Sequence, residues 1–492
     1  MAFKGKLEKV DDCRYRIPAS YQSDIMAQHG LKMNVPGIIY ADDRMIEAIR
    51  SDDSPEQVAN VATLPGIVGN SIAMPDIHHG YGFAIGGVAA FDTDEGIISP
   101  GGVGYDINCG VRMLRSDLHF GDVKDRIDRL INAIFANVPC GVGSQGKIRL
   151  SHGDLTRVLE KGARWAVENG YGWPDDLEVT EEEGGIEGAD ASTVSDTARK
   201  RGTGQLGTLG AGNHFLEIQR VDEIYDEEKA RAYGITGRDQ IVIMIHTGSR
   251  GCGHQICTDY LEVMRRANRK YNIPLIDREL SCAPASSEEG RQYFAAMNCG
   301  ANFAWANRQM ILHWVRESFE QVMKRSAHDM GLHQIYDIAH NIAKIEEHEY
   351  EGRTRRLVVH RKGATRAFGP GNPHIPAKYR AVGQPVLIPG DMGTASYLLA
   401  GTEKAMHETF GSSCHGAGRQ LSRTAARKRH PTETVFNELK AKNIYIQAKS
   451  RKVVSEEAPG AYKDIDAVVD ISDRAGIASK VVRLVPVGVA KG

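Results

Sequence analysis

Gln240-Ile-Val-Ile-Met-Ile-His-Thr-Gly-Ser-Arg250 predicts a buried strand that ends in a histidine. Residues 240–245 are an apolar run rich in β-branched side chains, which is typical of a strand covered on both faces. His246 stands at the C-terminal end of this run, where a rigid backbone can hold a metal ligand. A single histidine in such a place is more often a core residue than a ligand, so the decision depends on the rest of the sequence.

Helical and extended segments intermingle on both sides of this strand. Residues 122–138 carry apolar side chains at helical spacing, with Asp122 placed to cap the helix and Pro139 to end it. Residues 302–325 predict a second, longer helix. The acidic stretch 175–183 predicts an exposed loop.

Further apolar runs predict three short strands, at residues 357–359, 385–388 and 481–485. Pro486 should end the last of these, because proline lacks the N–H that a strand ladder needs. The chain contains no Pro/Ser-rich linker. We therefore expect an α/β mixed (α+β) fold in which residues 1–492 form one large domain, with mixed sheets flanked by helices.

The composition is that of a globular protein, with 41% hydrophobic and 25% charged residues among 492. No apolar run approaches the length of a membrane span, and the N-terminus lacks the apolar core of a signal peptide. The eight cysteines follow no framework spacing, which indicates free thiols or metal ligands. We expect a cytoplasmic protein without a membrane partner.

The net charge of −2 is not that of a typical nucleic-acid-binding protein, but the charge is unevenly distributed. Residues 351–430 hold 14 Lys and Arg against 4 Asp and Glu. A local basic surface can bind a polyanion even when the whole chain is near neutral. A solvated basic face is an equally good interpretation of the composition alone.

Four glycine-rich segments carry the side chains that bind transition metals. The candidate ligands are one carboxylate, one thiol and three imidazoles: Asp106, Cys109, His214, His246 and His340. Taken singly, each is better explained as a capping, buried or core residue, and only the set favours a metal site. Five ligands exceed the need of one tetrahedral ion, so a two-metal site of the kind used in phosphoryl transfer is plausible.

The segment 412–423 combines a histidine with glycines and arginines. Gly416 and Gly418 follow His415, and Arg419 and Arg423 are four residues apart. Glycines expose backbone N–H groups to phosphate, arginines pair with its oxygens, and a neutral imidazole can attack phosphorus. A phosphate-binding loop with an incidental histidine is the alternative.

A carboxylate near two histidines gives a further candidate pair. Asp76 precedes His78 and His79, and a carboxylate can orient an imidazole as in catalytic triads. His78 and His79 are additional ligand or base candidates, with a surface role expected for at least one of them.

Six ordered motifs resemble the RtcB family of tRNA-splicing RNA ligases. They lie at residues 75–82, 104–112, 210–217, 246–251, 339–341 and 415–419. The resemblance runs in order along nearly the whole chain, to the terminal Lys491-Gly492.

The resemblance implies a GTP- and Mn²⁺-dependent enzyme that joins 2′,3′-cyclic phosphate or 3′-phosphate RNA ends to 5′-hydroxyl ends, in tRNA splicing and RNA repair. It also implies that Cys109 bridges two Mn²⁺ ions, with His246 and His340 completing one site and Asp106 and His214 the other. His415 would take GMP from GTP, and GMP would then pass to the RNA 3′-phosphate as an RNA-3′-pp-5′-G intermediate.

Further roles follow from the same resemblance. Asp76 is expected to fix the tautomer of His415. The residues expected to hold the guanine nucleotide are Asn213, Glu217, Asn341, Ser396, His415, Gly416, Gly418, Tyr462 and Lys491. The residues expected to contact RNA phosphate are Arg250, Arg419 and Arg423.

Several alternatives stay open at the level of sequence. A thiolate with three imidazoles suits zinc or another soft-tolerant ion, whereas manganese comes from the resemblance alone. A dinuclear phosphoesterase or nuclease could use the same ligands, and an RNA-binding scaffold could hold a structural metal. A monomer is the default expectation. The sequence specifies neither the RNA substrate nor a need for archease, the activating partner found in the family.

Overall fold

The computed structural model describes residues 2–492, and its centre is a mixed sheet of eight strands. The predicted strand is confirmed as β9 (Gln240–Thr247), which is buried along its whole length between β7 (Gly110–His119) and β8 (Phe215–Ile224). The other members are β11 (Gln334–Ala339), β15 (Pro385–Ile388), β16 (Ser396–Gly401), β18 (Tyr445–Ala448) and β19 (Ala478–Lys491). The end strands β11 and β15 lie close together, so this sheet curves into a nearly closed barrel.

A second mixed sheet has seven strands and includes the N-terminal part of the chain. Its order is β1 (Glu8–Asp11), β2 (Arg14–Ile17), β3 (Gly37–Tyr40), β4 (Ile67–His78), β5 (Ile85–Asp92), β13 (Arg353–Lys362) and β12 (Asn341–Tyr350). Two small pairs complete the strands: β6 (Ile97–Ile98) with β10 (Ala283–Pro284), and β14 (Ala364–Arg366) with β17 (Ser412–Cys414).

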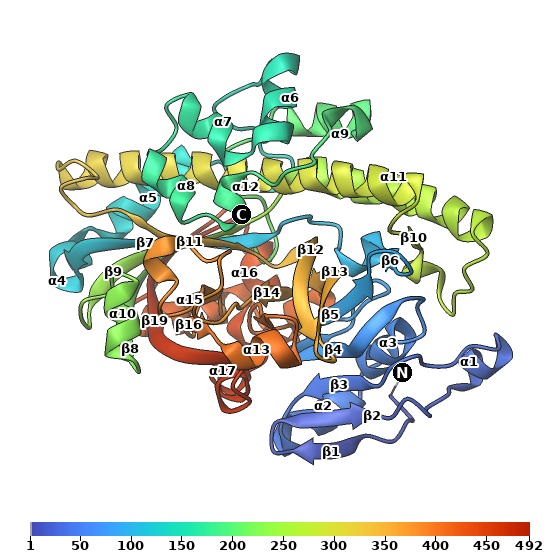
Figure 1. The fold of residues 1–492 in the computed structure, drawn as a ribbon. Helices are drawn as coiled ribbons and strands as arrows, with labels where there is room; N and C mark the ends of the chain where they lie inside the picture. Colours follow the sequence, from blue (N-terminus) through green and yellow to red (C-terminus); the bar gives the residue numbers. More distant parts are fainter. Residues whose placement is uncertain (1) are drawn as a thin grey trace.

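Two long helices, α11 (Arg250–Lys270) and α12 (Glu288–Met323), lie across one side of the sheets (Figure 1). A layer of short helices covers the far side of α12, and the sheets lie beneath it (Figure 1). The remaining helices are α1 (Asp24–Gln28), α2 (Asp43–Arg50), α3 (Ser54–Val61), α4 (Phe120–Val123), α5 (Ile127–Asn137), α6 (His152–Lys161), α7 (Ala163–Glu168), α8 (Pro174–Glu178), α9 (Asp196–Gly202), α10 (Glu227–Ala232), α13 (Glu403–Glu408), α14 (Arg423–Arg429), α15 (Thr432–Ala441), α16 (Arg451–Glu456) and α17 (Ile465–Arg474). The predicted fold class, mixed sheets flanked by helices, is confirmed. Among residues 2–492, no helix has both the length and the apolar character required to span a bilayer.

Both predicted helices differ from expectation at their N-termini. Residues 122–138 are divided into α4, a 3₁₀ turn and α5, and Asp122 lies inside α4, where it accepts a hydrogen bond from the backbone N–H of His119 (2.8 Å). The longer helix, α12, begins at Glu288, well before residue 302, because the Ser287 side chain caps it by accepting from the backbone N–H of Gly290. Helix α5 ends just ahead of Pro139, as predicted.

The prediction of an exposed loop at residues 175–183 is wrong. This stretch contains part of α8 and a 3₁₀ turn, and two of its carboxylates are buried. Asp176 pairs with Arg316 (2.7 Å), and Glu181 pairs with Lys344 (2.6 Å). A buried carboxylate needs such a partner, and the partners come from distant parts of the chain.

The prediction that Pro486 ends the last strand is also wrong. Strand β19 continues through Pro486 to Lys491. Its pairing with β8 shifts register between Pro486 and Gly488, and such an irregularity accommodates a residue that has no N–H to donate. The extension matters because it carries Lys491 to the end of the central sheet.

A buried ion pair connects three segments at one end of this sheet. Arg308 of α12 donates to both carboxylate oxygens of Asp337 on β11 (2.8 Å each). The same guanidinium donates to the carbonyl oxygens of Asn108 and Thr247 (2.8 Å each). Arg308 and Asp337 are both 0% exposed. One side chain therefore fixes the residues adjoining Cys109 and His246 together with the strand that leads to His340.

We predict that Arg308→Met lowers the free energy of unfolding by about 3 kcal/mol, because Asp337 loses its bidentate partner and two carbonyls lose their donor, while Arg112 still donates to Asp337 Oδ2 (2.6 Å). Arg291→Leu, in the exposed first turn of the same helix, should cost about 1 kcal/mol or less. Urea unfolding followed by circular dichroism measures both values. Equal stabilities for the two variants would contradict the role assigned to Arg308.

Candidate active site

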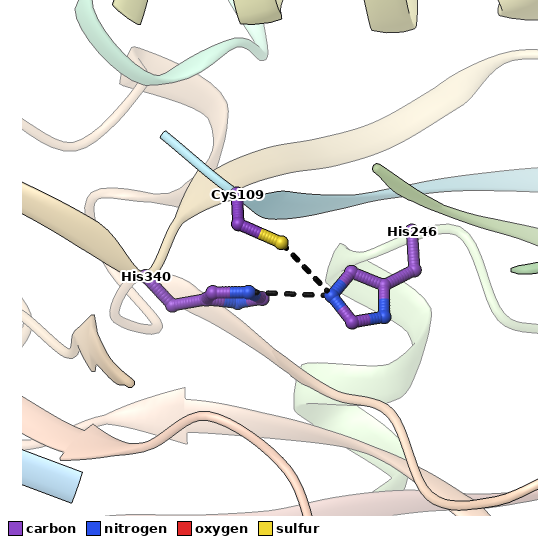
Figure 2. Close-up of side chains that lie close together, drawn as sticks. All are labelled: Cys109, His246 and His340. Atoms are coloured by element: carbon purple, nitrogen blue, oxygen red, sulfur yellow. Dashed lines mark hydrogen bonds between the residues drawn. The ribbon is translucent and has the colours of Figure 1, made fainter. Parts of the chain in front are cut away.

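Strand pairing brings three predicted ligands to one edge of the central sheet. Cys109 directly precedes β7, His246 lies near the end of β9, and His340 directly follows β11. Gly110, the first residue of β7, pairs with Thr247 on one side and with Ala339 on the other. Figure 2 shows the thiol and both imidazoles pointing toward one another.

The five predicted ligands form two groups that share Cys109. In the first, His246 Nε2 lies 3.4 Å from the Cys109 Sγ and 3.3 Å from His340 Nε2. In the second, His214 Nε2 lies 3.4 Å from the same sulfur and 2.9 Å from Asp106 Oδ2. Within residues 2–492, these are the only groups of three or more such donors close enough to hold one ion.

The environment sets the charge on each ligand. Burial, and then the positive charges of neighbouring histidines, keep the pKa values of His246 and His340 well below the ordinary value, so both imidazoles are neutral. Burial and the charge of Asp106 raise the pKa of the Cys109 thiol. Burial opposes ionisation of Asp106, but a hydrogen bond with His214 and the charges of His214 and Arg250 lower its pKa.

The arrangement fits one or two transition-metal ions. His214 Nδ1 donates to the carbonyl oxygen of Leu209 (3.0 Å), which leaves the Nε2 lone pair facing the cluster. Lone pairs of sulfur, nitrogen and oxygen thus converge in a buried place, and a cation would give them a common partner. Sulfur can contribute lone pairs to both groups, whereas each imidazole can serve only one. The donor set is mostly soft, with Asp106 as the one hard ligand.

His415 lies against this cluster, with its ring centroid 4.9 Å from that of His340. It directly follows β17, and the carboxylate of Asp76 on β4 accepts hydrogen bonds from its Nδ1 (2.5 Å) and from its backbone N–H (3.0 Å). Burial alone would raise the pKa of Asp76, but the interactions with His415 lower it, so Asp76 is a carboxylate. In the neutral form of the ring, its one proton is the Nδ1 proton that Asp76 accepts, and Nε2 then carries a free lone pair.

The neighbours of these two residues show why the sequence around them is constrained. Gly418 has a φ of +73°, and a Cβ there would lie 2.4 Å from the carbonyl oxygen of Asp76. Of the two adjacent histidines, His78 lines the cavity and its Nδ1 donates to the Asp76 carbonyl oxygen (2.8 Å). His79 is exposed and faces Asp53 (2.9 Å), as expected for a surface histidine.

The ligand cluster and His415 line a cavity of about 800 Å³. Most residues that the resemblance assigned to the nucleotide also line it: Asn213, Asn341, Gly416, Gly418, Tyr462 and Lys491. Glu217 and Ser396 do not. Both are buried behind the lining and are joined by Gln219, whose Nε2 donates to Glu217 Oε2 (2.7 Å) and to Ser396 Oγ (3.0 Å).

Asn341 has a positioning task that the sequence did not indicate. Its Nδ2 donates to the carbonyl oxygen of Asp106 (3.1 Å), and its Oδ1 accepts from the backbone N–H of Gly363 (2.9 Å). The amide therefore connects the loop that carries one metal ligand to the turn after β13.

Glu457 is a buried carboxylate in this site that sequence reasoning missed, because it belongs to no recognised motif. It pairs with Arg419 (2.9 Å) and Arg423 (3.2 Å), and it also accepts a short hydrogen bond from the Tyr462 hydroxyl. Arg419 is largely enclosed, whereas the side chain of Arg423 is 55% exposed. The third predicted phosphate contact, Arg250, is the first residue of α11 and lines the cavity near Asp106.

The basic stretch 351–430 does not form one continuous surface. Arg361, Lys362 and Arg366 are buried, and Arg361 and Arg366 are paired with glutamates. The exposed cations closest in sequence to His415 are Arg423 on α14 and Lys404 on α13, followed by Arg427, Lys428 and Arg429 at the end of α14. Composition alone could not distinguish internal cations from exposed ones.

We predict that the stability of the protein depends on the protonation of Glu217. Burial raises the pKa of this carboxyl to about 8, against about 4.3 for an unfolded glutamate. Between these values the folded state holds the extra proton, so the free energy of unfolding falls as pH rises. Glu217→Gln should remove this loss and be more stable than the original chain at pH 8, by on the order of a few kcal/mol.

The advantage of Glu217→Gln should shrink as pH falls toward about 4.5, near the unfolded pKa. Urea unfolding at several pH values measures the difference, with Glu228→Gln on the exposed face of α10 as control. A stability difference that does not change with pH would show that Glu217 is ionised in the folded chain.

Comparison with known proteins identifies the family. Residues 57–492 match the family model described as tRNA-splicing ligase RtcB. Three proteins named tRNA-splicing ligase RtcB are similar along nearly the whole of both chains. The relative from Thermococcus kodakarensis is 58% identical over 486 residues, which is 99% of each chain, and the relative from Methanococcus maripaludis is 56% identical over 489 residues, which is 99% of this chain and all of the relative. A third, from Archaeoglobus fulgidus, is 55% identical over 492 residues, all of both chains. The chain therefore belongs to the tRNA-splicing ligase RtcB family.

Proposed function

We propose that this protein is an RNA ligase that uses GTP and Mn²⁺ to join 2′,3′-cyclic phosphate or 3′-phosphate ends to 5′-hydroxyl ends, in tRNA splicing and RNA repair. The observation that carries the proposal is the placement of His415. Its Nδ1 is held by the buried carboxylate of Asp76, and its ring packs against His340 of the ligand cluster. A neutral imidazole so oriented, beside a set of metal ligands, is suited to attack a phosphorus atom.

In the proposed first step, the lone pair of His415 Nε2 attacks the α-phosphorus of GTP. An N–P bond forms, the bond from that phosphorus to the bridging oxygen breaks, and pyrophosphate leaves with the electron pair. Asp76 keeps the Nδ1 proton in place and stabilises the positive charge that develops on the ring. No proton has to leave Nε2, because the hydrogen bond to Asp76 already selects the tautomer.

The metal ligands have a defined part in this proposal. Cys109, His246 and His340 would hold one ion, and Asp106, Cys109 and His214 the other. Bound there, divalent cations would neutralise phosphate oxygens as negative charge develops on them. The protein contributes the fixed spacing of these ligands. Arg308 helps to maintain it by donating to the carbonyl oxygens of Asn108 and Thr247, which adjoin Cys109 and His246.

The end of the cavity beyond His415 is proposed to hold the guanine nucleotide. Lys491, Tyr462 and Asn213 line it. Burial lowers the pKa of Lys491, while the charge of Glu457 opposes that change. Glu217 and Ser396 would support the nucleotide site from behind its lining, through Gln219.

Two transfers would complete the reaction. An oxygen of the RNA 3′-phosphate attacks the guanylate phosphorus, the N–P bond breaks, and His415 Nε2 regains its lone pair. The 5′-hydroxyl oxygen then attacks the RNA 3′-phosphorus, loses its proton and expels GMP. Arg250 and the exposed Arg423 are the cations proposed to receive RNA phosphates, since Arg419 is enclosed by its pairing with Glu457. A cyclic phosphate would first be hydrolysed in the same site: water attacks the phosphorus, the bond from phosphorus to the 2′ oxygen breaks, and that oxygen takes a proton to give the 2′-hydroxyl and the 3′-phosphate.

We predict that α-labelled GTP with Mn²⁺ leaves a label on the protein that acid removes and alkali largely preserves, as expected of a histidine phosphoramidate. His415→Ala should abolish labelling because it removes the attacking nitrogen. His407→Ala, on exposed α13, is the matched control and should label like the original chain. Gel autoradiography after acid or alkali treatment gives the answer.

An unlabelled original chain would contradict the ligase mechanism and favour a dinuclear phosphoesterase or a structural metal site, because neither of these forms a nucleotide adduct. Label that persists in His415→Ala would show that another side chain is the nucleophile.

A further inference from the structure

Three aromatic side chains line the cavity and have no part in the proposed reaction steps. They belong to segments far from Tyr462 and Lys491 in the sequence. Tyr105 stacks on His254, with ring centroids 4.9 Å apart and an interplanar angle of 27°. Tyr81 meets Tyr105 edge to face, with centroids 5.5 Å apart. All three residues line the same cavity as the ligand cluster and His415. We call Tyr81, Tyr105 and His254 the aromatic platform.

The aromatic platform is open to a ligand. His254 is exposed, and Tyr81 and Tyr105 are each half-buried. One face of Tyr105 is covered by His254, so the outer face of His254 and part of Tyr81 are the aromatic surfaces that remain accessible. Aromatic rings left uncovered in a cavity are the surfaces on which nucleobases stack.

The platform is also held rigidly. Lys362 donates to the carbonyl oxygen of Tyr81 (2.6 Å), and Gly82 donates to Glu279 Oε2 (2.9 Å). Gly82 has a φ of +69°, and a Cβ there would lie 2.5 Å from the carbonyl oxygen of Glu279. The turn that presents Tyr81 is therefore fixed before any ligand arrives, which lowers the entropic cost of binding.

Arg201 and Arg250 line the same cavity as the platform and the ligand cluster. Arg250 is the first residue of α11 and His254 follows four residues later, and both line the cavity. Ser249, which directly precedes Arg250, donates to Asp106 Oδ1 (3.3 Å), so Arg250 adjoins a residue that contacts the ligand cluster. Tyr105 directly precedes Asp106 in the chain. Arg201 lines the same part of the cavity and is exposed.

We infer that the aromatic platform binds the terminal nucleobase of an RNA end, with the adjoining phosphate between it and the ligand cluster, on Arg250. This inference rests on the proposed ligase function and extends it to an RNA subsite. A cationic groove with interleaved aromatic rings is the usual means of binding single-stranded nucleic acid without sequence preference. Binding without sequence preference suits an enzyme that must accept the ends of different RNAs. Either the 3′-phosphate end or the 5′-hydroxyl end can supply the base, and the experiment separates the two.

The test compares His254→Ala, which removes a stacking surface, with His254→Phe, which keeps one. Tyr81→Leu is a second variant that keeps apolar bulk but loses the ring, and His407→Ala is the control outside the cavity. Labelling by GTP without RNA should be unchanged in all four, which shows that the fold, the ligand cluster and His415 are intact. For ligation by pre-labelled enzyme, His254→Ala and Tyr81→Leu should raise KM for RNA about tenfold or more, since stacking is worth roughly 1–3 kcal/mol per base. His254→Phe should stay near the original value.

Abasic substrates identify the RNA end. Removing the base at the 3′-phosphate terminus or at the 5′-hydroxyl terminus should raise KM for the original chain in only one of the two cases. In His254→Ala, the same abasic change should have little further effect, because the stacking partner is already gone.

Unchanged KM in both His254→Ala and Tyr81→Leu, with labelling and ligation intact, would overturn the platform while leaving the ligase proposal in place. Independent, additive costs of the abasic change and His254→Ala would overturn it too. Absence of labelling in the original chain would instead reject the ligase mechanism itself.

Discussion

The ion pair between Arg308 and Asp337 is the interaction on which the site depends. A guanidinium has donors in a fixed planar arrangement, and here they serve both oxygens of Asp337 and the carbonyls of Asn108 and Thr247. Those carbonyls belong to residues directly adjoining Cys109 and His246, and Asp337 lies three residues before His340. A charge buried this deeply is costly unless every donor is used. The need to satisfy one arginine therefore fixes three ligand segments that are far apart in the sequence.

A second constraint explains the choice of ligands. Two donor groups lie so close together that they share a sulfur atom, and only a side chain with several lone pairs can belong to both. His246 and His340 are neutral because they are buried, which suits both to bind a cation. His415 stays outside both groups because its Nδ1 is engaged by Asp76. Burial and one carboxylate thus separate the roles of four neighbouring histidines.

Sequence reasoning predicted the features that depend on local pattern. The strand at residues 240–245 and the end of the helix before Pro139 follow from periodicity and proline chemistry, and both are present. The five candidate ligands were selected by side-chain type and by family motif, and the fold brings them together. Features that depend on distant partners could not be predicted. Asp176 and Glu181 looked like loop residues until Arg316 and Lys344 were placed beside them.

The same limit applies within the site. Glu457 lies in no motif, yet it pairs with the two arginines that the motif supplied. Pro486 was expected to end a strand, but a register irregularity lets β19 continue to Lys491. The aromatic platform joins residues from three separate segments, and no periodicity in the sequence relates them. Pairings between distant residues, rather than propensity, determine these parts of the molecule.

We propose above all that the five ligands form two metal sites that share the thiol of Cys109. Anomalous diffraction from crystals of the protein grown with Mn²⁺ tests it directly. The account predicts two peaks, one among Cys109, His246 and His340 and one among Asp106, Cys109 and His214, with the sulfur of Cys109 bound to both. Ions bound elsewhere, or a sulfur of Cys109 that contacts neither ion, would contradict it.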